Sequence, residues 1–280
     1  MAEAYSDVVQ TARDYYNSED ADNFYFHIWG GEDIHIGLYE SPTEAIHVAS
    51  RRTVETMADL LPALSPGSRV LDLGSGYGGA ARYIAKRFGC QVTALNLSEK
   101  ENERNRAMCV EAGLDQQVDV LDGSFEDIPL PDASVDVVWS QDAILHSGRR
   151  APVVEEAARV LKPGGRFVFT DPMESGQCGR EDLEPVLARI HLETLGSFAF
   201  YEETCRAVGL TSLEQRDLTP QLITHYSRVA EELTAQREAL NGKVSDGYID
   251  RMLTGLNNWV VAGQKGCLAW GIMHFQKQSG

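Results

Sequence analysis

The chain has 280 residues, with 42 acidic against 25 basic side chains and a net charge of −17 at pH 7. Such an acidic surface repels phosphate backbones, so nucleic acid is excluded as the expected partner. The 43% hydrophobic content is ample for a core, and no apolar run approaches the roughly 18 residues that a membrane span needs. Two explanations of the charge stay open: ordinary solubility, and adaptation to the salt-rich cytoplasm of a halophile, where counter-ions screen the repulsion.

The cysteines and the first residues bear on the compartment. The cysteines are odd in number, widely spaced and without a C-x-x-C pair, which predicts neither a zinc site nor a disulfide framework. They are Cys90, Cys109, Cys178, Cys205 and Cys267. The segment Met1–Tyr5 has neither a basic nor an apolar character, so no secretory signal is expected. We therefore expect a metal-free protein in a reducing cytoplasm.

Apolar spacing and turn residues predict the elements in chain order. Helical patterns cover 5–16 and 43–61, and a Ser-Pro-Gly turn follows at 65–67. Next, strands are expected at 69–73, 91–95, 118–121, 134–139 and 166–170, alternating with helices at 80–88, 98–112 and 153–161. A last strand is expected at 268–275, and the loop-rich 172–200 and helical 220–264 interrupt the pattern as insertions. Alternating strands and helices predict a parallel, doubly wound sheet, with insertions over the strand ends where ligands bind.

The segment Val70–Gly79 carries the strongest motif. A buried strand breaks into a glycine-rich turn before a helix, and Gly74, Gly76 and Gly79 satisfy the G-x-G-x-x-G spacing. Glycine takes positive φ freely and lets a ligand approach the backbone, and the following helix N-terminus suits a nucleotide-like ligand. The match alone is weak, because loops reach this spacing for packing reasons too.

Two polar residues near this turn sharpen the prediction. Asp72 occupies a strand position that is normally apolar in dinucleotide sites, so it is expected either to face a cationic group or to cap the turn. Asn96 ends the next strand, where a side chain that contacts ribose should project. On the helix that follows, Ser98 and Glu101 form a predicted capping box.

Three ordered motifs resemble the class I S-adenosylmethionine-dependent methyltransferases. They are Asp72-Leu-Gly-Ser-Gly, Asp122-Gly-Ser-Phe and Leu161-Lys-Pro-Gly-Gly-Arg-Phe. The resemblance implies an α/β, doubly wound Rossmann-like fold with a seven-stranded, mostly parallel sheet and helical cap insertions. It implies S-adenosylmethionine as cofactor, with S-adenosylhomocysteine as product. The implied cofactor-binding residues are Asp72, Gly74, Ser75, Gly76, Asn96, Leu97, Asp122, Gly123, Ser124, Phe125 and Gln141.

Segments outside this core narrow the resemblance to sarcosine/dimethylglycine N-methyltransferases, which make glycine betaine. The segments are 25–39, 139–146, 170–173 and 225–227. The stretch Ser140–His146 also resembles phosphoethanolamine methyltransferases, in which a matching Asp and His act on the amine. That resemblance implies Asp142 and His146 as catalytic residues.

Amine chemistry agrees with these two residues. Methyl transfer to nitrogen needs a free lone pair, whereas an alkylammonium has a pKa of about 10. Asp142 and His146 lie four residues apart, one helical turn, so they are expected to share a face, with His146 accepting the proton. Asp142 would then bind the amine or orient the imidazole. The alternative is an Asp–His pair that caps a loop.

The substrate itself suggests further residues. A quaternary ammonium is best held by aromatic faces, and a carboxylate by arginine or by neutral hydrogen-bond donors. The alternative for the aromatic residues is a plain core, and for the arginines a solvated surface. The candidate substrate-binding residues are Tyr16, Tyr25, Phe26, Trp29, Arg52, His225 and Tyr226, with Arg51 and Arg228 as further candidates.

The sequence therefore predicts an N-methyltransferase that converts sarcosine and dimethylglycine to glycine betaine. The segment 1–62 is expected to form an N-terminal helical lid and acceptor site, 63–172 the cofactor-binding core, and 173–280 the rest of the sheet with the substrate cap. Expected partners are the small amine substrates alone, without nucleic acid or membrane, on a monomer or weak homo-oligomer in the cytoplasm. Alternatives are a phosphoethanolamine-type or other small-amine methyltransferase, and a catalytically silent cofactor-binding regulatory subunit.

Overall fold

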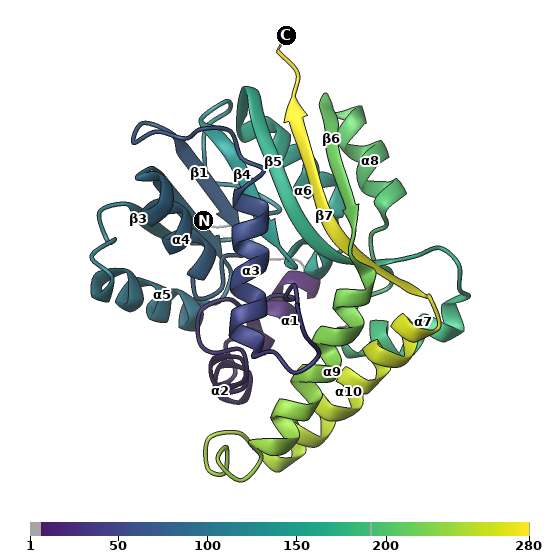
Figure 1. Cartoon of the computed structure of the whole chain (residues 1–280). Helices are drawn as coiled ribbons and strands as arrows, with labels where there is room; N and C mark the ends of the chain where they lie inside the picture. Colours follow the sequence, from purple (N-terminus) through teal and green to yellow (C-terminus); the bar gives the residue numbers. More distant parts are fainter. Residues whose placement is uncertain (1–6, 191, 280) are drawn as a thin grey trace.

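The computed structural model describes residues 7–190 and 192–279, so the Met1–Tyr5 segment lies outside the described residues. Its centre is a seven-stranded sheet in the order β3-β2-β1-β4-β5-β7-β6 (Figure 1). The strands are β1 Arg69–Leu73, β2 Gln91–Asn96, β3 Val118–Asp122, β4 Val135–Gln141, β5 Leu161–Glu174, β6 Leu210–Asp217 and β7 Leu268–Lys277. Only β7 runs antiparallel to its neighbours, β5 and β6. The predicted fold class is confirmed.

Helices cover both faces of this sheet. They are α1 Asp7–Tyr16, α2 Glu19–Ile28, α3 Ile46–Ala58, α4 Gly79–Phe88, α5 Glu99–Glu111, α6 Arg150–Val160, α7 Arg180–Arg189, α8 Phe198–Ala207, α9 Thr219–Ala235 and α10 Asp246–Gln264. Successive strand residues point to opposite faces. Val70 accordingly joins the core beneath α3, α4 and α5, whereas Leu71 joins the core beneath α6 and α8.

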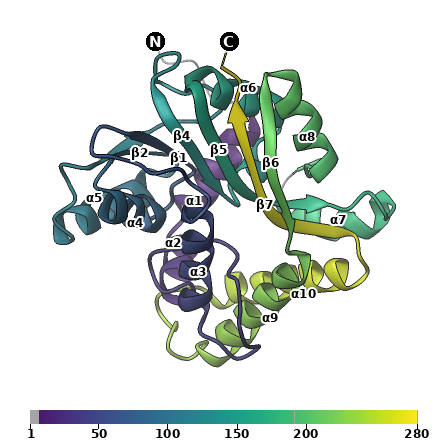
Figure 2. The same ribbon diagram turned by 45° about the horizontal axis from the view of Figure 1, so that its top comes forward.

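The carboxyl ends of the parallel strands meet at one end of the sheet, where a second group of helices lies. Figures 1 and 2 both place α1, α2, α9 and α10 at this end, with α9 and α10 side by side. Helices α2, α9 and α10 pack together around a separate hydrophobic core, which includes Phe24, Val229 and Leu256. The predicted insertions over the strand ends are thus present as packed helices.

Several elements differ from the sequence prediction. The helical stretch 220–264 is two helices, α9 and α10, and the loop-rich 172–200 contains α7 with Pro185 inside it. The unpredicted strand β6 lies at the sheet edge, where alternate residues face solvent and leave a weak apolar pattern. Helix α2 was also missed, although Ser18 caps it by accepting a hydrogen bond from the Ala21 amide.

The expectation of no disulfide was wrong. Cys178, before α7, is bonded to Cys267, which precedes β7, across a sequence separation of 89 residues. Cys90, Cys109 and Cys205 are buried free thiols. Wide spacing along the chain carries no information about a pair that the sheet topology brings together, because β7 returns beside β5.

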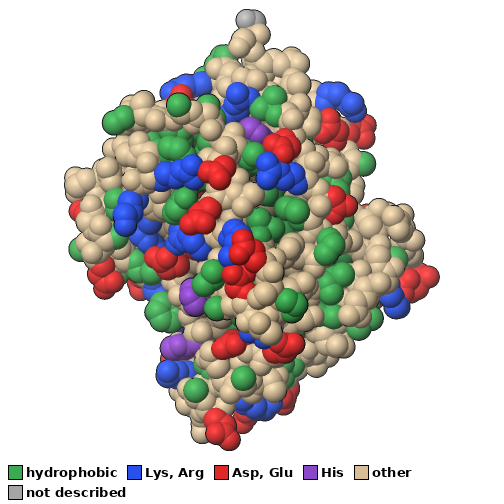
Figure 3. Space-filling model, viewed as in Figure 1, with side chains coloured by type: hydrophobic (Ala, Val, Ile, Leu, Met, Phe, Trp, Pro, Cys, Tyr) green, Lys and Arg blue, Asp and Glu red, His purple; other side chains and the backbone are tan. Residues whose placement is uncertain are grey.

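The surface shows mixed charge. In Figure 3, acidic and basic side chains are interspersed over the visible face. Ion pairs join different elements of the chain, as between Arg87 and Asp59 and between Arg51 and Glu32. Within the described residues, no helix is both long and apolar enough to cross a membrane.

Candidate active site

Two adjoining cavities lie at the carboxyl ends of the strands. The first, the glycine-loop cavity, is lined by the turn after β1 and by residues that follow β2, β3 and β4. The second, the tyrosine cavity, lies among α1, α2, α7, α9 and α10. One wall is common to both, formed by Ala12, Tyr16, Ile34, His35, Asp142 and His146.

The turn after β1 requires glycine at two positions. Gly74 has φ +70°, and an added Cβ would lie 2.3 Å from the Cβ of Ala143. Gly76 has φ +50°, and its Cβ would lie 2.9 Å from Cδ1 of Ile34. Because of the positive φ and the close neighbouring side chains, any residue other than glycine would be strained at these positions. The backbone therefore forms the floor of the glycine-loop cavity.

Five buried polar atoms in this lining have no hydrogen-bond partner. They are Asp33 Oδ1, His35 Nε2, Asp72 Oδ2, Ser75 Oγ and Gln141 Nε2. Leaving such groups unsatisfied costs about 1–3 kcal/mol each, so their clustering indicates a polar ligand. Burial raises the pKa of Asp72 to about 7, with a further contribution from Asp33, and burial raises the pKa of Asp33 to about 6. A cationic group on the ligand would stabilise both carboxylates, and S-adenosylmethionine, with its α-ammonium, fits this donor and acceptor set.

A third acid, Glu101, lies in the cavity beside β2. Asn96 donates from Nδ2 to Glu101 Oε2 at 2.8 Å, and both residues line the glycine-loop cavity with Leu97. Ser98 Oγ accepts from the Glu101 amide, but the Glu101 carboxylate does not return to Ser98, so the predicted capping box is only half formed. Burial raises the pKa of Glu101 to about 7. Glu101 was not predicted to line the cavity, because the capping pattern already accounted for an acid at this position.

The motif after β3 divides between cavity and surface. Ser124 and Phe125 line the glycine-loop cavity, whereas Asp122 and Gly123 do not. The Asp122 carboxylate is exposed, pairs with Arg106 at 2.6 Å and accepts from Asn102 at 2.8 Å. The expectation of a direct cofactor contact from Asp122 is corrected accordingly, because these partners hold its side chain outside the cavity.

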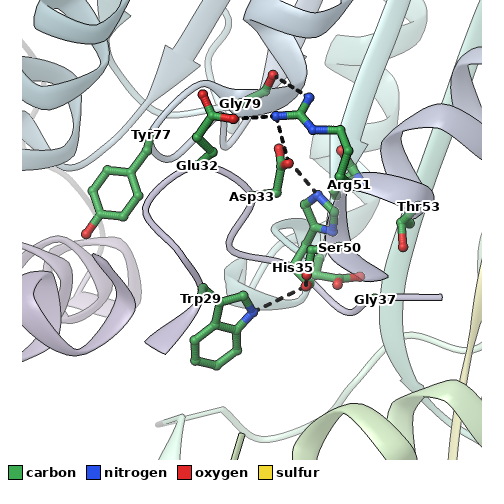
Figure 4. Close-up of polar contacts among 12 residues, drawn as sticks. Trp29, Glu32, Asp33, His35, Gly37, Ser50, Arg51, Thr53, Tyr77 and Gly79 are labelled. Carbon is green, nitrogen blue, oxygen red and sulfur yellow. Dashed lines mark hydrogen bonds and ion pairs between the residues drawn. The ribbon is translucent and has the colours of Figure 1, made fainter. Parts of the chain in front are cut away.

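The loop between α2 and α3 is pinned in place above the turn (Figure 4). Arg51 points toward Glu32, Asp33 and the carbonyl of Gly79, with 2.9 Å to the Asp33 carboxylate. Ser50 and Trp29 both donate to the His35 carbonyl, at 2.9 and 3.3 Å. Arg51 is therefore occupied by carboxylates of this chain rather than available to a substrate.

Asp142 is fixed from two sides in the shared wall. Its Oδ2 accepts from the Ile36 amide and its Oδ1 from Trp270 Nε1, both at 2.7 Å. Burial raises the pKa of Asp142, while His35 and the donors that surround the carboxylate lower it. The residue adopts φ +51°, outside any helix. The carboxyl group of Asp142 is thus held in place at the junction of the cavities.

His146 has a different partner from the predicted one. It ends a 3-10 turn, Ile144–His146, and its Nε2 lies 2.9 Å from the Tyr16 hydroxyl. No hydrogen bond joins it to Asp142 among the described residues. The expectation of a shared helical face was wrong, because Asp142 lies in a bend at φ +51°, before the 3-10 turn begins. Burial, then Arg189 and Arg150, lower the pKa of His146 to about 4. The imidazole is neutral at pH 7.

Aromatic residues form the tyrosine cavity. Tyr16 and Tyr25 have ring centroids 5.6 Å apart, and Tyr25 and Trp29 5.1 Å. Tyr226 lines the same cavity. Phe26 does not: it packs under Arg104, 4.4 Å from its ring, because one residue along a helix turns the side chain by about 100°. The predicted role of Phe26 is corrected.

His225 presents a hydrogen-bond donor to the tyrosine cavity. Its Nδ1 accepts from the Gly37 amide at 3.2 Å, so the proton lies on Nε2, which has no partner. Arg52 is outside both cavities, because it pairs with Glu44 at 2.7 Å, and Arg228 is occupied by Glu231. The proposed substrate contact of Arg52 is therefore corrected.

The comparisons with known proteins agree with this geometry. The methyltransferase domain family matches residues 71–169. The sarcosine/dimethylglycine N-methyltransferase of Halorhodospira halochloris is 54% identical over 99% of this chain and 100% of that protein. The chain belongs to the sarcosine/dimethylglycine N-methyltransferase family. The predicted family, methyltransferase class and S-adenosylmethionine cofactor are thereby confirmed.

Two further similarities define how much of each protein is covered. A glycine/sarcosine/dimethylglycine N-methyltransferase of Actinopolyspora halophila is 54% identical over 98% of this chain, which spans only 48% of that relative. The crystal structure of a putative sarcosine dimethylglycine methyltransferase from Galdieria sulphuraria is 40% identical, with a TM-score of 0.90, and covers 95% of this chain and 100% of that one. The family resemblance thus extends over both cavities.

Proposed function

We propose that the chain transfers methyl groups from S-adenosylmethionine to the nitrogen of sarcosine and of N,N-dimethylglycine, with glycine betaine as the final product. The observation that carries this proposal is the junction of the two cavities. Tyr16, Asp142 and His146 face both the glycine-loop cavity and the tyrosine cavity. Methyl transfer needs the donor sulfonium and the acceptor nitrogen to meet in line, and two ligands in adjoining cavities can meet where those cavities join.

The glycine-loop cavity is proposed to hold the cofactor, which supplies an electrophilic methyl group on a sulfonium. Asp72 and Asp33 would receive its ammonium group, since both carboxylates have unpartnered oxygens there. Asn96 and Glu101 would receive ribose hydroxyls, while Leu97, Ser124, Phe125 and Gln141 complete the lining around Gly74, Ser75 and Gly76.

The amine end of the substrate is proposed to lie at Asp142 and His146. An incoming ammonium, with a pKa of about 10, is attracted by the fixed carboxylate of Asp142. Because His146 is neutral, it can accept the ammonium proton, and Tyr16 orients its imidazole through the 2.9 Å hydrogen bond. Once deprotonated, the nitrogen presents its lone pair toward the glycine-loop cavity.

Aromatic faces are proposed to hold the methylated product. A quaternary ammonium has no N–H to donate, and cation–π attraction of about 0.5–2 kcal/mol per ring replaces those hydrogen bonds. Tyr16, Tyr25 and Trp29 supply neighbouring faces in the same cavity, next to Asp142. Each added methyl group increases contact with these rings. His225 Nε2 and Tyr226 would donate to the carboxylate end.

A direct assay tests the proposal. The purified chain is given S-adenosylmethionine with glycine, sarcosine, dimethylglycine or phosphoethanolamine, and the product masses are measured. We expect betaine from dimethylglycine, and dimethylglycine then betaine from sarcosine. Product from phosphoethanolamine alone would show that the acceptor is a phosphorylated amine and not an amino acid. Cofactor binding without any product would favour a catalytically silent regulatory subunit. A His146→Gln variant should bind cofactor normally but lose turnover about 10²–10⁴-fold.

We further propose that residues 1–62 form the lid and part of the acceptor site, 63–172 the cofactor core, and 173–280 the substrate cap. The chain is proposed to act in the cytoplasm as a monomer or weak homo-oligomer. Sedimentation over a tenfold concentration range tests the assembly, and cell fractionation tests the compartment. Titration of the Cys178–Cys267 disulfide in cell extracts adds a direct check, since a reducing cytoplasm would keep that pair open.

A further inference from the structure

We propose that Arg189 binds the carboxylate of the methyl acceptor and so restricts this enzyme to amino-acid amines. The inference rests on the proposed function, because it takes the acceptor to be a methylated amino acid in the tyrosine cavity. Arg189 lies in the segment 172–200 that the sequence pattern predicted to be loop-rich, and no motif pointed to it. In the structure it is the last residue of α7 and lines the tyrosine cavity.

The guanidinium of Arg189 has no counter-charge among the residues that the structure describes. Within the part of the chain that the structure describes, it pairs with no carboxylate, and it donates a hydrogen bond to the sulfur of Met252 at 3.1 Å. Thioether sulfur is a weak acceptor. Arg237, in the same lining, instead pairs with Asp246 and Asp250, each at 2.8 Å. A largely buried cation without an acid is costly unless a ligand supplies the negative charge.

Tyrosines surround this cation. Burial lowers the pKa of Arg189, but interactions with neighbouring tyrosines raise it by more. The net pKa lies above the usual arginine value, so the guanidinium stays charged. The four tyrosines that exert this effect are Tyr15, Tyr25, Tyr226 and Tyr248. Three of them also join by hydroxyl contacts, with 2.8 Å between Tyr15 and Tyr248 and 3.4 Å between Tyr15 and Tyr25. The guanidinium therefore lies among neutral polar groups and aromatic rings.

Helix α10 leaves room for Arg189 at one position. A Cβ on Gly255 would lie 2.2 Å from Cδ and 2.5 Å from Nε of Arg189. Glycine inside a helix is less favourable than alanine. Gly255 is the point at which the arginine side chain crosses α10, so any larger residue there must displace the guanidinium.

The arrangement fits a zwitterion better than a phosphorylated base. A carboxylate matches one planar guanidinium in a two-pronged hydrogen bond. Asp142 and His146 then take the amine at the shared wall. A phosphate dianion calls for several cations. Of the other basic lining residues, Lys243 and Arg251 are exposed to solvent and Arg237 is paired with two carboxylates.

The test compares dimethylglycine with its neutral amide, N,N-dimethylglycinamide, in wild type, Arg189→Gln and the matched control Arg237→Gln. For dimethylglycine, Arg189→Gln should raise KM about 10–100-fold with kcat within about threefold, as expected for loss of a charged hydrogen-bond pair. For the amide, wild type and Arg189→Gln should have the same KM. Arg237→Gln should match wild type with both acceptors, and Arg189→Lys should recover part of the loss.

Two more readouts separate binding from a structural role. Gly255→Ala keeps the charge but displaces it, and should raise KM for dimethylglycine while leaving cofactor affinity unchanged. In Arg189→Gln the acid limb of kcat/KM should move to higher pH, since Arg189 lowers the pKa of His146.

The outcomes are distinguishable. If wild type methylates dimethylglycine but Arg189→Gln changes KM equally for the acid and the amide, or for neither, the role of Arg189 is refuted and the proposed function stands. If wild type methylates neither acceptor, the proposed function fails first. Should Arg189→Gln not fold, the same comparison of acid and amide in Gly255→Ala and Arg189→Lys decides.

Discussion

The two cavities differ in how the chain builds them. Most of the glycine-loop cavity comes from one stretch, Asp72–His146, with a few residues of the N-terminal segment over it. The tyrosine cavity takes its lining from segments between Val8 and Trp259. The first is shaped by a backbone turn at the strand ends and the second by side chains from distant helices. A local sequence motif therefore predicts most of the cofactor site, whereas the acceptor site is assembled from segments that are far apart along the chain.

Their electrostatics differ as well. The glycine-loop cavity contains polar atoms without a hydrogen-bond partner, such as Asp72 Oδ2 and Ser75 Oγ, which a ligand could satisfy. At the shared wall, Asp142 and His146 are already fixed, with both Asp142 oxygens occupied and His146 bonded to Tyr16. Cofactor binding should thus depend on satisfying buried groups, and catalysis on charges that are held before the substrate arrives.

The largest effect is expected at the shared wall. Asp142→Asn is nearly isosteric, but it removes the carboxylate that is proposed to attract the ammonium, together with one of the two hydrogen bonds that Asp142 accepts. We expect kcat/KM for dimethylglycine to fall about 10²–10³-fold, the loss typical of one preorganised electrostatic group. Cofactor affinity, measured by calorimetry, should change less than about threefold. A parallel loss of cofactor affinity would show that the two cavities are not separable at this residue.

The glycine turn gives the next effect, on the cofactor side alone. Gly74→Ala forces a side chain to φ +70° and 2.3 Å from Ala143. Backbone strain of about 1–3 kcal/mol plus this clash should weaken cofactor binding roughly 10–100-fold. Gly113→Ala is the matched control, because its φ is +66° but nothing lies within 4 Å. Equal cofactor affinities in the two variants would contradict a shape-determined turn.

A pH titration of cofactor affinity follows. Asp72 must be ionised to receive an ammonium, and burial raises its pKa to about 7 in the protein without ligand. Affinity should therefore fall about tenfold per pH unit below that value, and Asp72→Asn should remove most of this dependence. A carboxyl with a raised pKa costs stability as pH rises through it, so Asp72→Asn should also raise Tm at pH 8. A pH-independent affinity in wild type would contradict the assignment.

The smallest effect is expected outside both cavities. Arg52→Gln removes a partly exposed ion pair with Glu44. Such pairs contribute about 0–1 kcal/mol, so Tm should fall slightly and KM for dimethylglycine should stay within twofold. Comparing KM for dimethylglycine in Arg52→Gln and Arg189→Gln contrasts an arginine that is paired with a carboxylate of this chain with one that is not. A large rise in KM for Arg52→Gln would restore the sequence-based assignment.

The sequence by itself determined six of the seven strands, the glycine turn and most of the polar residues at the strand ends. These depend on short-range patterns: β1 reads as a buried strand, and Gly74 and Gly76 occupy a turn that only glycine fits. The family motifs added the seventh strand and the methyltransferase class. Tyr16, Tyr25, Trp29, His225 and Tyr226 were also predicted from sequence, and the structure brings them into one cavity.

Only the tertiary structure decided which polar groups are paired. Arg52, Asp122 and Phe26 have suitable chemistry in the sequence, but Glu44, Arg106 and Arg104 hold them elsewhere. Arg189 and the Cys178–Cys267 bond lie in segments without a recognisable pattern, and partners far along the chain define both. A side chain's free or paired state is a property of its neighbours in space, and an apolar or polar pattern along the chain does not encode it.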